Sequence, residues 1–350
     1  MQTATLIIPG LSEVNATSCE RVLKMAARSV RHQTSMSGYE LATLRALGYD
    51  DTSIQVPAAK CSHLADFNES ASEYCARADP VCLKTDREDA RLIPAENLSL
   101  EPSQAERLVG SLNEHFDEDG LRFLIGRKNR WYVTGSVDTE LDAAPVNQVA
   151  GRPVANYLPQ SANASKWRRL ANEVQMLLHN HPVNVEREAG GLLPVNALWF
   201  WGAAPLPERS HSPSCRLFSD AAYAVGLARL SGITAFPYAE GAASLRQKHG
   251  RGQAAGSRSD NVIIVNTALL ESILSQDEAR QQEQLLSIEN SLLASAERAL
   301  WRGQLKRLVL DTCDQYQYVV TRASLCKVWR RPTSLSRLED RPTVDEFGHR

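Results

Sequence analysis

The sequence predicts an α/β fold with a central, mainly parallel sheet that carries helices on both faces. Two observations support this class. Strand-like apolar runs alternate with amphipathic helical stretches along the chain, which is the pattern of layered α/β proteins. Asn261–Val265 (NVIIV) is almost wholly apolar, as expected for a parallel strand covered on both faces. A length of 350 residues is compatible with two domains, or with one core that carries a sizeable insertion.

The first half of the chain contains one clear strand and three clear helices. Thr5–Ile8 is apolar and stops at Pro9-Gly10, a dipeptide that favours a turn. Helical spacing of apolar residues follows at Glu20–Val30 and Tyr39–Leu47. Leu98–Phe116 has the same spacing, and Ser99 is a candidate N-cap for it.

A hairpin and a helix come next. Arg122–Ile125 and Arg130–Val133 are β-prone runs separated by turn residues, so they predict two paired strands. Lys166–His179 has an amphipathic pattern. It is expected to stop near His181-Pro182, because the residue before a proline avoids the helical region.

The last part of the chain returns to buried strands. Ala197–Trp201 predicts an aromatic-rich strand, and Arg307–Asp311 and Tyr316–Val320 predict two more. Ser219–Leu230 and Ser275–Trp301 predict helices, each followed by a glycine suited to a helix end. The tail, residues 332–350, is rich in Pro, Arg, Asp and Glu and is expected to be disordered.

Composition excludes several partners. A net charge of −2 gives no basic face for nucleic acid, and no apolar run approaches the length of a membrane span. The seven cysteines contain no CxxC pair and the start lacks the basic region of a signal peptide. We therefore expect a cytoplasmic protein without a zinc site or disulfide framework.

Residues 177–204 hold the candidate ligand site. This segment crowds polar side chains beside large apolar ones, as in a lined pocket. The candidate residues are His179, Asn180, His181, Asn184, Arg187 and Asn196. In one interpretation Arg187 holds a small anionic metabolite while His and Asn side chains orient it. In the other, these side chains cap turns and satisfy buried carbonyls.

The aromatic residues Trp199, Phe200 and Trp201 are interpreted as core rather than as a platform for a ligand, since an aromatic platform for bases works together with a basic groove.

The segment HPVNVEREAGGLLPVNALWFWGAA resembles the archaeal-type cofactor-independent phosphoglycerate mutases, which carry a similar H-P-x-N-x-x-R stretch. The following SDAAYAVGLARLSGI is similar to a small-residue helix of that family. The chain resembles even more a bacterial offshoot known as regulatory protein RpfE. Upstream, Asp79–Val81, Leu100–Leu108 and Phe123–Trp131 are similar to the insertion domain of the mutase family.

This resemblance implies an alkaline-phosphatase-like core over residues 1–69 and 166–331 and an inserted α+β subdomain over 70–165. It also implies a family mechanism with two divalent metals and a serine nucleophile.

Several positions depart from the family pattern. Pro9-Gly10 stands where the family has Asp-Gly, and Asn266–Glu271 lacks the family's Asp and His. Asp311-Thr312-Cys313-Asp314 replaces its Asp-His-Ser-Thr, and Trp201 replaces an arginine. Ser37, before Gly38, is a weak candidate for the nucleophile. Two metals need carboxylates and histidines around them, so we predict no metal site and no bound cofactor.

The sequence thus predicts a mutase-like protein that has lost its dinuclear metal site and acts as a regulatory or small-molecule-binding protein. A second hypothesis is an active mutase or phosphatase with rearranged ligands, for example Asp311, Asp314 and one histidine. A third is a module that binds a protein partner through its Trp-rich apolar face.

Overall fold

The computed structural model describes residues 3–14, 19–34, 37–49, 56–71, 74–86, 89–135, 141–160, 164–246 and 261–330. The tail predicted to be disordered, 332–350, lies outside them. The chain forms two compact units. The core unit comprises Met1–Thr52, Glu208–Ile273 and Asp277–Arg350, and the inserted unit comprises Ser53–Pro207 and Leu274–Gln276.

The core unit is built on a seven-stranded sheet with the order β2-β12-β11-β1-β10-β8-β9. Strands β1, β8, β9, β10 and β11 run parallel, whereas β12 is antiparallel to both of its neighbours. The strands are β1 (Thr3–Ile7), β2 (Val30–Gln33), β8 (Cys215–Phe218), β9 (Ala235–Phe236), β10 (Asn261–Val265), β11 (Arg307–Asp311) and β12 (Tyr316–Thr321).

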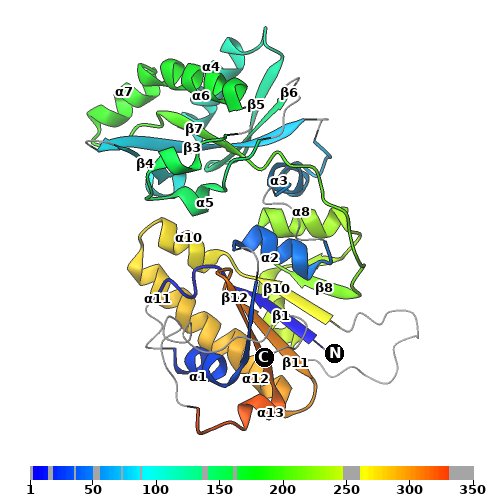
Figure 1. Ribbon diagram of the computed structural model, residues 1–350. Coiled ribbons are helices and arrows are strands. Elements are labelled where there is room, and N and C mark those ends of the chain that lie inside the picture. Colours follow the sequence, from blue (N-terminus) through cyan, green and yellow to red (C-terminus); the bar gives the residue numbers. More distant parts are fainter. Residues whose placement is uncertain are drawn as a thin grey trace. The chain divides into compact units, whose positions relative to one another are not determined.

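Helices lie on both faces of this sheet (Figure 1). Alternate residues of β1, among them Leu6, pack with the apolar sides of α1 and α12, while α2 contacts β1 and α8. The helices are α1 (Glu20–Arg28), α2 (Tyr39–Ala46), α8 (Ala222–Leu230), α9 (Gly241–Ser244), α10 (Ala268–Leu274), α11 (Glu278–Ser287), α12 (Ala294–Trp301) and α13 (Arg322–Leu325). The predicted α/β class with a mainly parallel sheet is confirmed.

The inserted unit has a second, antiparallel sheet. Its strands follow the order β4-β3-β6-β5, and β7 pairs with β3 as well. These strands are β3 (Cys75–Asp86), β4 (Asp89–Pro94), β5 (Leu121–Arg127), β6 (Arg130–Gly135) and β7 (Ala197–Trp201).

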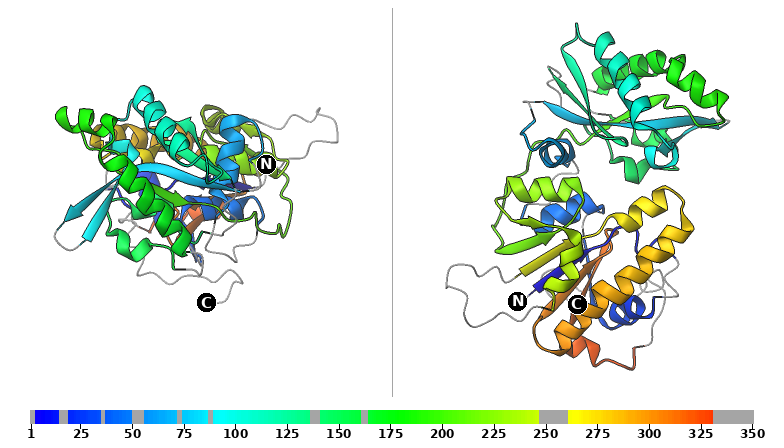
Figure 2. Two further views of the ribbon diagram at one scale, coloured as in Figure 1. Left: turned by 90° about the horizontal axis from the view of Figure 1, so that it is seen from above. Right: turned by 180° about the vertical axis from the view of Figure 1, so that it is seen from behind.

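The α-helices in the described part of the inserted unit are α3 (Ala58–Phe67), α4 (Pro102–His115), α5 (Val146–Val149), α6 (Ala164–His179) and α7 (Pro182–Ala189). Helices α4 and α6 cover one face of its sheet, where Trp131 and Phe200 are buried, and α5 lies on the other side (Figure 2).

This compact unit is wider than the range 70–165 that we predicted for the insertion. The difference has a direct cause: β7 pairs with β3, α6 packs on β7, and α3 contacts β3 and β5. Segments on both sides of the predicted range therefore share one core with it.

The start of α4 corrects one predicted cap. The helix begins at Pro102, and Glu101 rather than Ser99 is its N-cap. Glu101 and Gln104 form a reciprocal capping box, and proline suits the first helical position because its fixed φ and missing N–H cost nothing there. Ser99 instead has a positive φ of 49° in the preceding turn.

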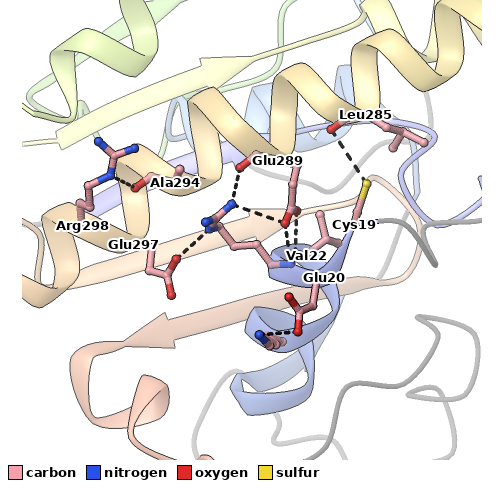
Figure 3. A network of polar contacts seen from close by, with 10 residues as sticks. Cys19, Glu20, Val22, Leu285, Glu289, Ala294, Glu297 and Arg298 are labelled. Carbon is pink, nitrogen blue, oxygen red and sulfur yellow. Dashed lines mark hydrogen bonds and ion pairs between the residues drawn. The ribbon is translucent and has the colours of Figure 1, made fainter.

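The long helix predicted at Ser275–Trp301 contains a π-helical turn, η5 (Ile288–Leu293), between α11 and α12. This turn carries Glu289, whose carboxylate accepts hydrogen bonds from the backbone N–H groups of Arg21 and Val22 at 2.6 and 3.1 Å (Figure 3). Helix α1 has no side-chain cap of its own, so a carboxylate from another helix satisfies its first turn.

No helix within the described parts of the chain is both long and apolar enough to cross a bilayer.

Candidate functional site: the α4–α7 groove and the strand ends

Asn184 and Asn196 tie segments of the inserted unit together. Asn184 Nδ2 donates to the carbonyl oxygens of Leu178 and Val195, both at 2.8 Å, and Asn184 Oδ1 accepts from Val195 N–H at 2.9 Å. Asn196, just before β7, exchanges two hydrogen bonds with the backbone of Leu83 on β3. Both amides therefore replace missing backbone partners, which is an architectural task.

Arg187 is buried, with 1% of its surface exposed. Its Nε donates to Leu193 O at 2.9 Å, Nη1 to Gln104 Oε1 at 2.5 Å, and Nη2 to Leu98 O. The guanidinium fork thus joins α7 to the turn before α4 and to the segment after α7. For Asn184, Asn196 and Arg187 this geometry favours the architectural interpretation over anion binding.

His181 is the N-cap of α7. Its Nδ1 accepts the Val183 N–H at 3.2 Å, and its Nε2 lies 2.9 Å from Ser111 Oγ on α4. An Nδ1 that accepts a hydrogen bond carries no proton, so in the neutral ring the proton is on Nε2 and is donated to Ser111. Burial, and secondarily the charge of Arg107, lower the pKa of His181.

This tautomer matters for chemistry. A histidine that activates a serine must accept the hydroxyl proton on the nitrogen facing it. His181 instead donates to Ser111, so the pair is not arranged as a nucleophile with its base.

An open groove of about 940 Å³ lies beside this pair. Two predicted residues, Asn180 and His181, line it, whereas exposed His179 at the end of α6 does not. Arg107 forms a bidentate ion pair across the groove with Glu186, at 2.7 and 2.8 Å. The remaining lining residues are Gly110, Ser111, Glu114, His115, Glu118, Leu177 and Pro182.

Arg107 and Ser111 are residues that the sequence interpretation missed. The signal was present, because Arg107, Ser111 and His115 recur every four residues in a predicted helix and so share one of its faces.

Among the described residues of the core unit, acids follow or end β8 and β11 (Asp220 and Asp311), whereas neutral residues follow β1 and β10. Pro9 follows β1, and Asn266 follows β10. Asn266 Oδ1 accepts from Ala268 N–H at 2.9 Å and its Nδ2 donates to the Tyr238 hydroxyl at 2.7 Å. Its amide therefore caps the start of α10 and ties it to Tyr238.

Asp311, at the end of β11, is the buried acid at this edge. It accepts hydrogen bonds from Cys313 N–H at 2.9 Å and Gln317 Nε2 at 2.7 Å. Burial raises its pKa, while these two hydrogen bonds act in the opposite direction. Asp314 accepts from Tyr316 N–H at 2.7 Å, so it serves the same turn.

Strand β12 lies between β11, which ends at Asp311, and β2, which carries His32. His32 pairs with Gln317 in the sheet, and Gln317 pairs with Asp311. Two strand spacings amount to roughly 10 Å. The side chain of Gln317, which lies between His32 and Asp311 in the sheet, donates to Asp311 Oδ2 and so occupies the oxygen on that side.

Among the residues that the structure describes, no group of three or more His, Cys, Asp or Glu side chains could hold a metal ion. The residues at the strand ends thus do not fit the metal pair that the family resemblance implies.

Trp199, Phe200 and Trp201 are all buried, which confirms their interpretation as core. The indole N–H of Trp199 donates to Ala144 O, and that of Trp201 donates to Asp79. A Trp-rich surface for a partner is therefore not formed by β7.

The comparisons with known proteins agree on one family. The family model of 2,3-bisphosphoglycerate-independent phosphoglycerate mutase matches residues 32–184. The mutase of Methanosarcina mazei is 24% identical over 176 residues, which cover 49% of this chain and 43% of that protein. Mutase 2 of Methanothermobacter thermautotrophicus is 30% identical over 122 residues, 34% of this chain and 30% of the relative.

These alignments span less than half of the length of either relative. A solved mutase structure from Thermoplasma acidophilum aligns over 98% of this chain and 96% of its own, with a TM-score of 0.40 and 16% identity. At that score the fold assignment rests on the strand order described above, not on the alignment. Residues 32–184 of the chain are thus similar to the 2,3-bisphosphoglycerate-independent phosphoglycerate mutases.

Proposed function

We propose that this mutase relative does not build a dinuclear metal centre and acts in the cytoplasm as a regulatory or small-molecule-binding protein. The main support for this proposal comes from the residues at the strand ends of the core unit. Pro9 and Asn266 offer no carboxylate there, and the oxygens of Asp311 already accept two hydrogen bonds. Phosphoryl transfer between bound metals needs several anionic ligands at one place, because each metal must be held on more than one side.

The ligand we propose is a small anionic metabolite, and the groove between α4 and α7 is where it binds. Arg107 is the cationic fork of this groove, and its side chain is 48% exposed. Exposed ion pairs contribute little to stability, so an incoming carboxylate or phosphate replaces Glu186 on the fork at small cost. Ser111, which accepts from His181, keeps its own hydroxyl proton for the ligand.

The groove also limits that ligand. Glu114 and Glu118 line it and repel negative charge. A compact anion that reaches Arg107 and Ser111 without crossing these two acids fits best.

The metal question is tested on the purified full chain. We expect less than stoichiometric bound metal and no mutase turnover with added manganese. Stoichiometric metal together with turnover would instead establish the second hypothesis, an active enzyme with rearranged ligands such as Asp311, Asp314 and one histidine.

The ligand question is tested by thermal shift with 2-phosphoglycerate and 3-phosphoglycerate. A ligand that binds only the folded state raises the melting temperature by mass action. We expect Arg107→Ala to abolish the shift, and Arg122→Ala, an exposed arginine on β5 outside the groove, to retain it. If neither compound shifts the melting temperature and a protein co-purifies in fixed ratio, the third hypothesis, a protein-binding module, replaces this one.

A further inference from the structure

His181 joins three features that together make α7 sensitive to acid. It is 8% exposed, it caps the helix through Nδ1, and its other nitrogen is committed to Ser111. A histidine is an uncommon N-cap, since Ser, Thr, Asp and Asn are the usual choices and none of the four titrates near neutral pH as an imidazole does. The choice of cap therefore links the start of α7 to proton concentration.

We propose that His181 is an acid-operated lock on α7: the neutral ring caps the helix, and uptake of a proton at Nδ1 removes the cap and loosens the first turn. The proton adds at the lone pair that now receives the Val183 N–H. Two N–H donors then face each other, and the hydrogen bond cannot form. The Nε2–H bond to Ser111 exists in both states, so only the cap is lost.

The charges around the ring act in the same sense. A cation at a helix N-terminus opposes the helix dipole. Arg107 on α4 adds a second positive charge nearby, and Glu186 on α7, which would favour the imidazolium, is paired with that arginine. Glu114, His115 and Glu118 on α4 line the same groove, and His115 is paired with Glu173 of α6.

Loss of the cap reaches beyond one hydrogen bond because α7 carries two anchors. Asn184 and Arg187, in the next turns, hold Val195, Leu193 and Leu98. Opening of the first turn weakens the hold of α7 on these segments and opens the groove lined by Asn180, His181 and Pro182. The response of His181 to acid requires neither a bound metal nor the metabolite proposed above.

The direction with pH follows from the lowered pKa. The folded state favours the neutral ring, so the full contribution of His181 is present above the ordinary pKa of 6.5 and is lost as the pH falls below that value towards the folded pKa.

The direct test is amide hydrogen exchange of Val183 on the full chain, corrected for the intrinsic pH dependence of exchange. Between about pH 7.5 and about pH 5.5 we expect protection to fall by roughly fivefold to tenfold, the value of a lost cap. His181→Asn supplies a cap that does not titrate, so it should make the protection independent of pH. His115→Asn, which changes an exposed histidine of the same groove, should leave the acid response intact.

Nitrogen chemical shifts of the ring give a second readout that needs no variant. We expect Nδ1 of His181 to be unprotonated near neutral pH and to take up its proton in the same range in which Val183 loses protection. A protonated Nδ1 at neutral pH, a pH-independent Val183 amide in the unmodified protein, or an unchanged acid response in His181→Asn would each overturn the proposal.

Discussion

Arg187 in the inserted unit and Asp311 in the core unit are two buried charges held by neutral groups, but they organise very different lengths of chain. The partners of Arg187 are Leu98, Gln104 and Leu193, so its fork joins segments far apart in sequence. The partners of Asp311 are Cys313 and Gln317, which lie in the turn and strand that directly follow it. The cation is a tertiary anchor, whereas the anion organises one local turn.

The comparison separates a charge that the fold needs from one that it can do without. A guanidinium has five donors in a fixed fork, so it can satisfy several carbonyls at once, which no neutral side chain of similar size does. A carboxylate that only accepts from one N–H and one amide can be replaced by a neutral isostere. The two charges should therefore respond in opposite ways to removal.

The largest effect is expected for Arg187→Ala. The change removes the donor of Leu98 O, Leu193 O and Gln104 Oε1. The loss is most costly at Leu98, which is buried, because an unsatisfied buried carbonyl keeps its full desolvation penalty. We expect the free energy of unfolding, measured by urea titration, to fall by about 3–5 kcal/mol.

Arg122→Ala, on an exposed strand position, is the matched control and should change stability little. A loss below about 1 kcal/mol for Arg187→Ala would show that the fork is not an anchor.

The strands show how much of the fold could be predicted from the sequence. Asn261–Val265, Ala197–Trp201 and Arg307–Asp311 were predicted as strands with the boundaries that the structure has, because each is a run of buried apolar residues. Strands β2 (VRHQ) and β4 (DARLIP) were missed. Strand β2 is rich in polar residues, and β4 is a short run that ends in proline, so their strand character comes from pairing with β12 and β3 rather than from their own pattern.

The candidate site shows the same limit. Sequence reasoning found Asn184, Arg187 and Asn196 as unusual polar residues, but their roles depend on partners as distant as Leu83 and Leu98. Arg107 and Ser111 share a helix face that was visible in the sequence. That this face meets the start of α7 depends on tertiary packing, which no local pattern contains.

A second, smaller effect tests a carboxylate that lies between the two cases. Glu289 accepts from the backbone of Arg21 and Val22, and Arg21 Nη1 lies 3.4 Å from its Oε1 (Figure 3). Like Arg187 it joins distant segments, and like Asp311 it is an anion. Glu289→Gln turns one acceptor into a donor that faces an N–H, so we expect a loss of about 1–2 kcal/mol in unfolding free energy.

Faster amide exchange at Arg21 and Val22 should accompany this loss, since those N–H groups lose their acceptor. Glu278→Gln, at an exposed position in the first turn of α11, is the control variant. If Glu289→Gln is as stable as the unmodified chain, helix α1 does not depend on this carboxylate for its stability.

A third effect has the opposite sign. Burial raises the pKa of Asp311, so its ionised form is disfavoured in the folded state. For such a group stability is greatest when the acid is protonated, and it falls as the pH rises from about 3.8 through the raised folded pKa. Asp311→Asn removes this penalty, and the Gln317 amide can turn its oxygen towards the new NH2 group, which the backbone donors to Glu289 cannot do. We therefore expect the variant to match or exceed the unmodified chain at neutral pH, by up to about 1 kcal/mol.

The advantage of Asp311→Asn should shrink as the pH is lowered towards 3.8, because the native acid is then neutral as well. Urea titrations at several pH values measure this difference. A variant that is clearly less stable at neutral pH and also loses a bound metal would return Asp311 to the role of a ligand.

The smallest effect on stability, and the most direct on function, is expected for Arg107→Ala. Arg107 and Glu186 form an exposed ion pair, whereas the guanidinium of Arg187 is buried. The urea midpoint of Arg107→Ala should therefore stay within experimental error of the unmodified chain. The thermal shift produced by phosphoglycerates should nevertheless disappear, because the cationic fork is gone.

Glu186→Gln sharpens the comparison: it frees Arg107 from its carboxylate without removing the fork, so it should strengthen binding of the anion. Binding that survives Arg107→Ala and is unaffected by Glu186→Gln would show that the ligand binds outside this groove, and Arg107 would then have only its exposed ion pair with Glu186.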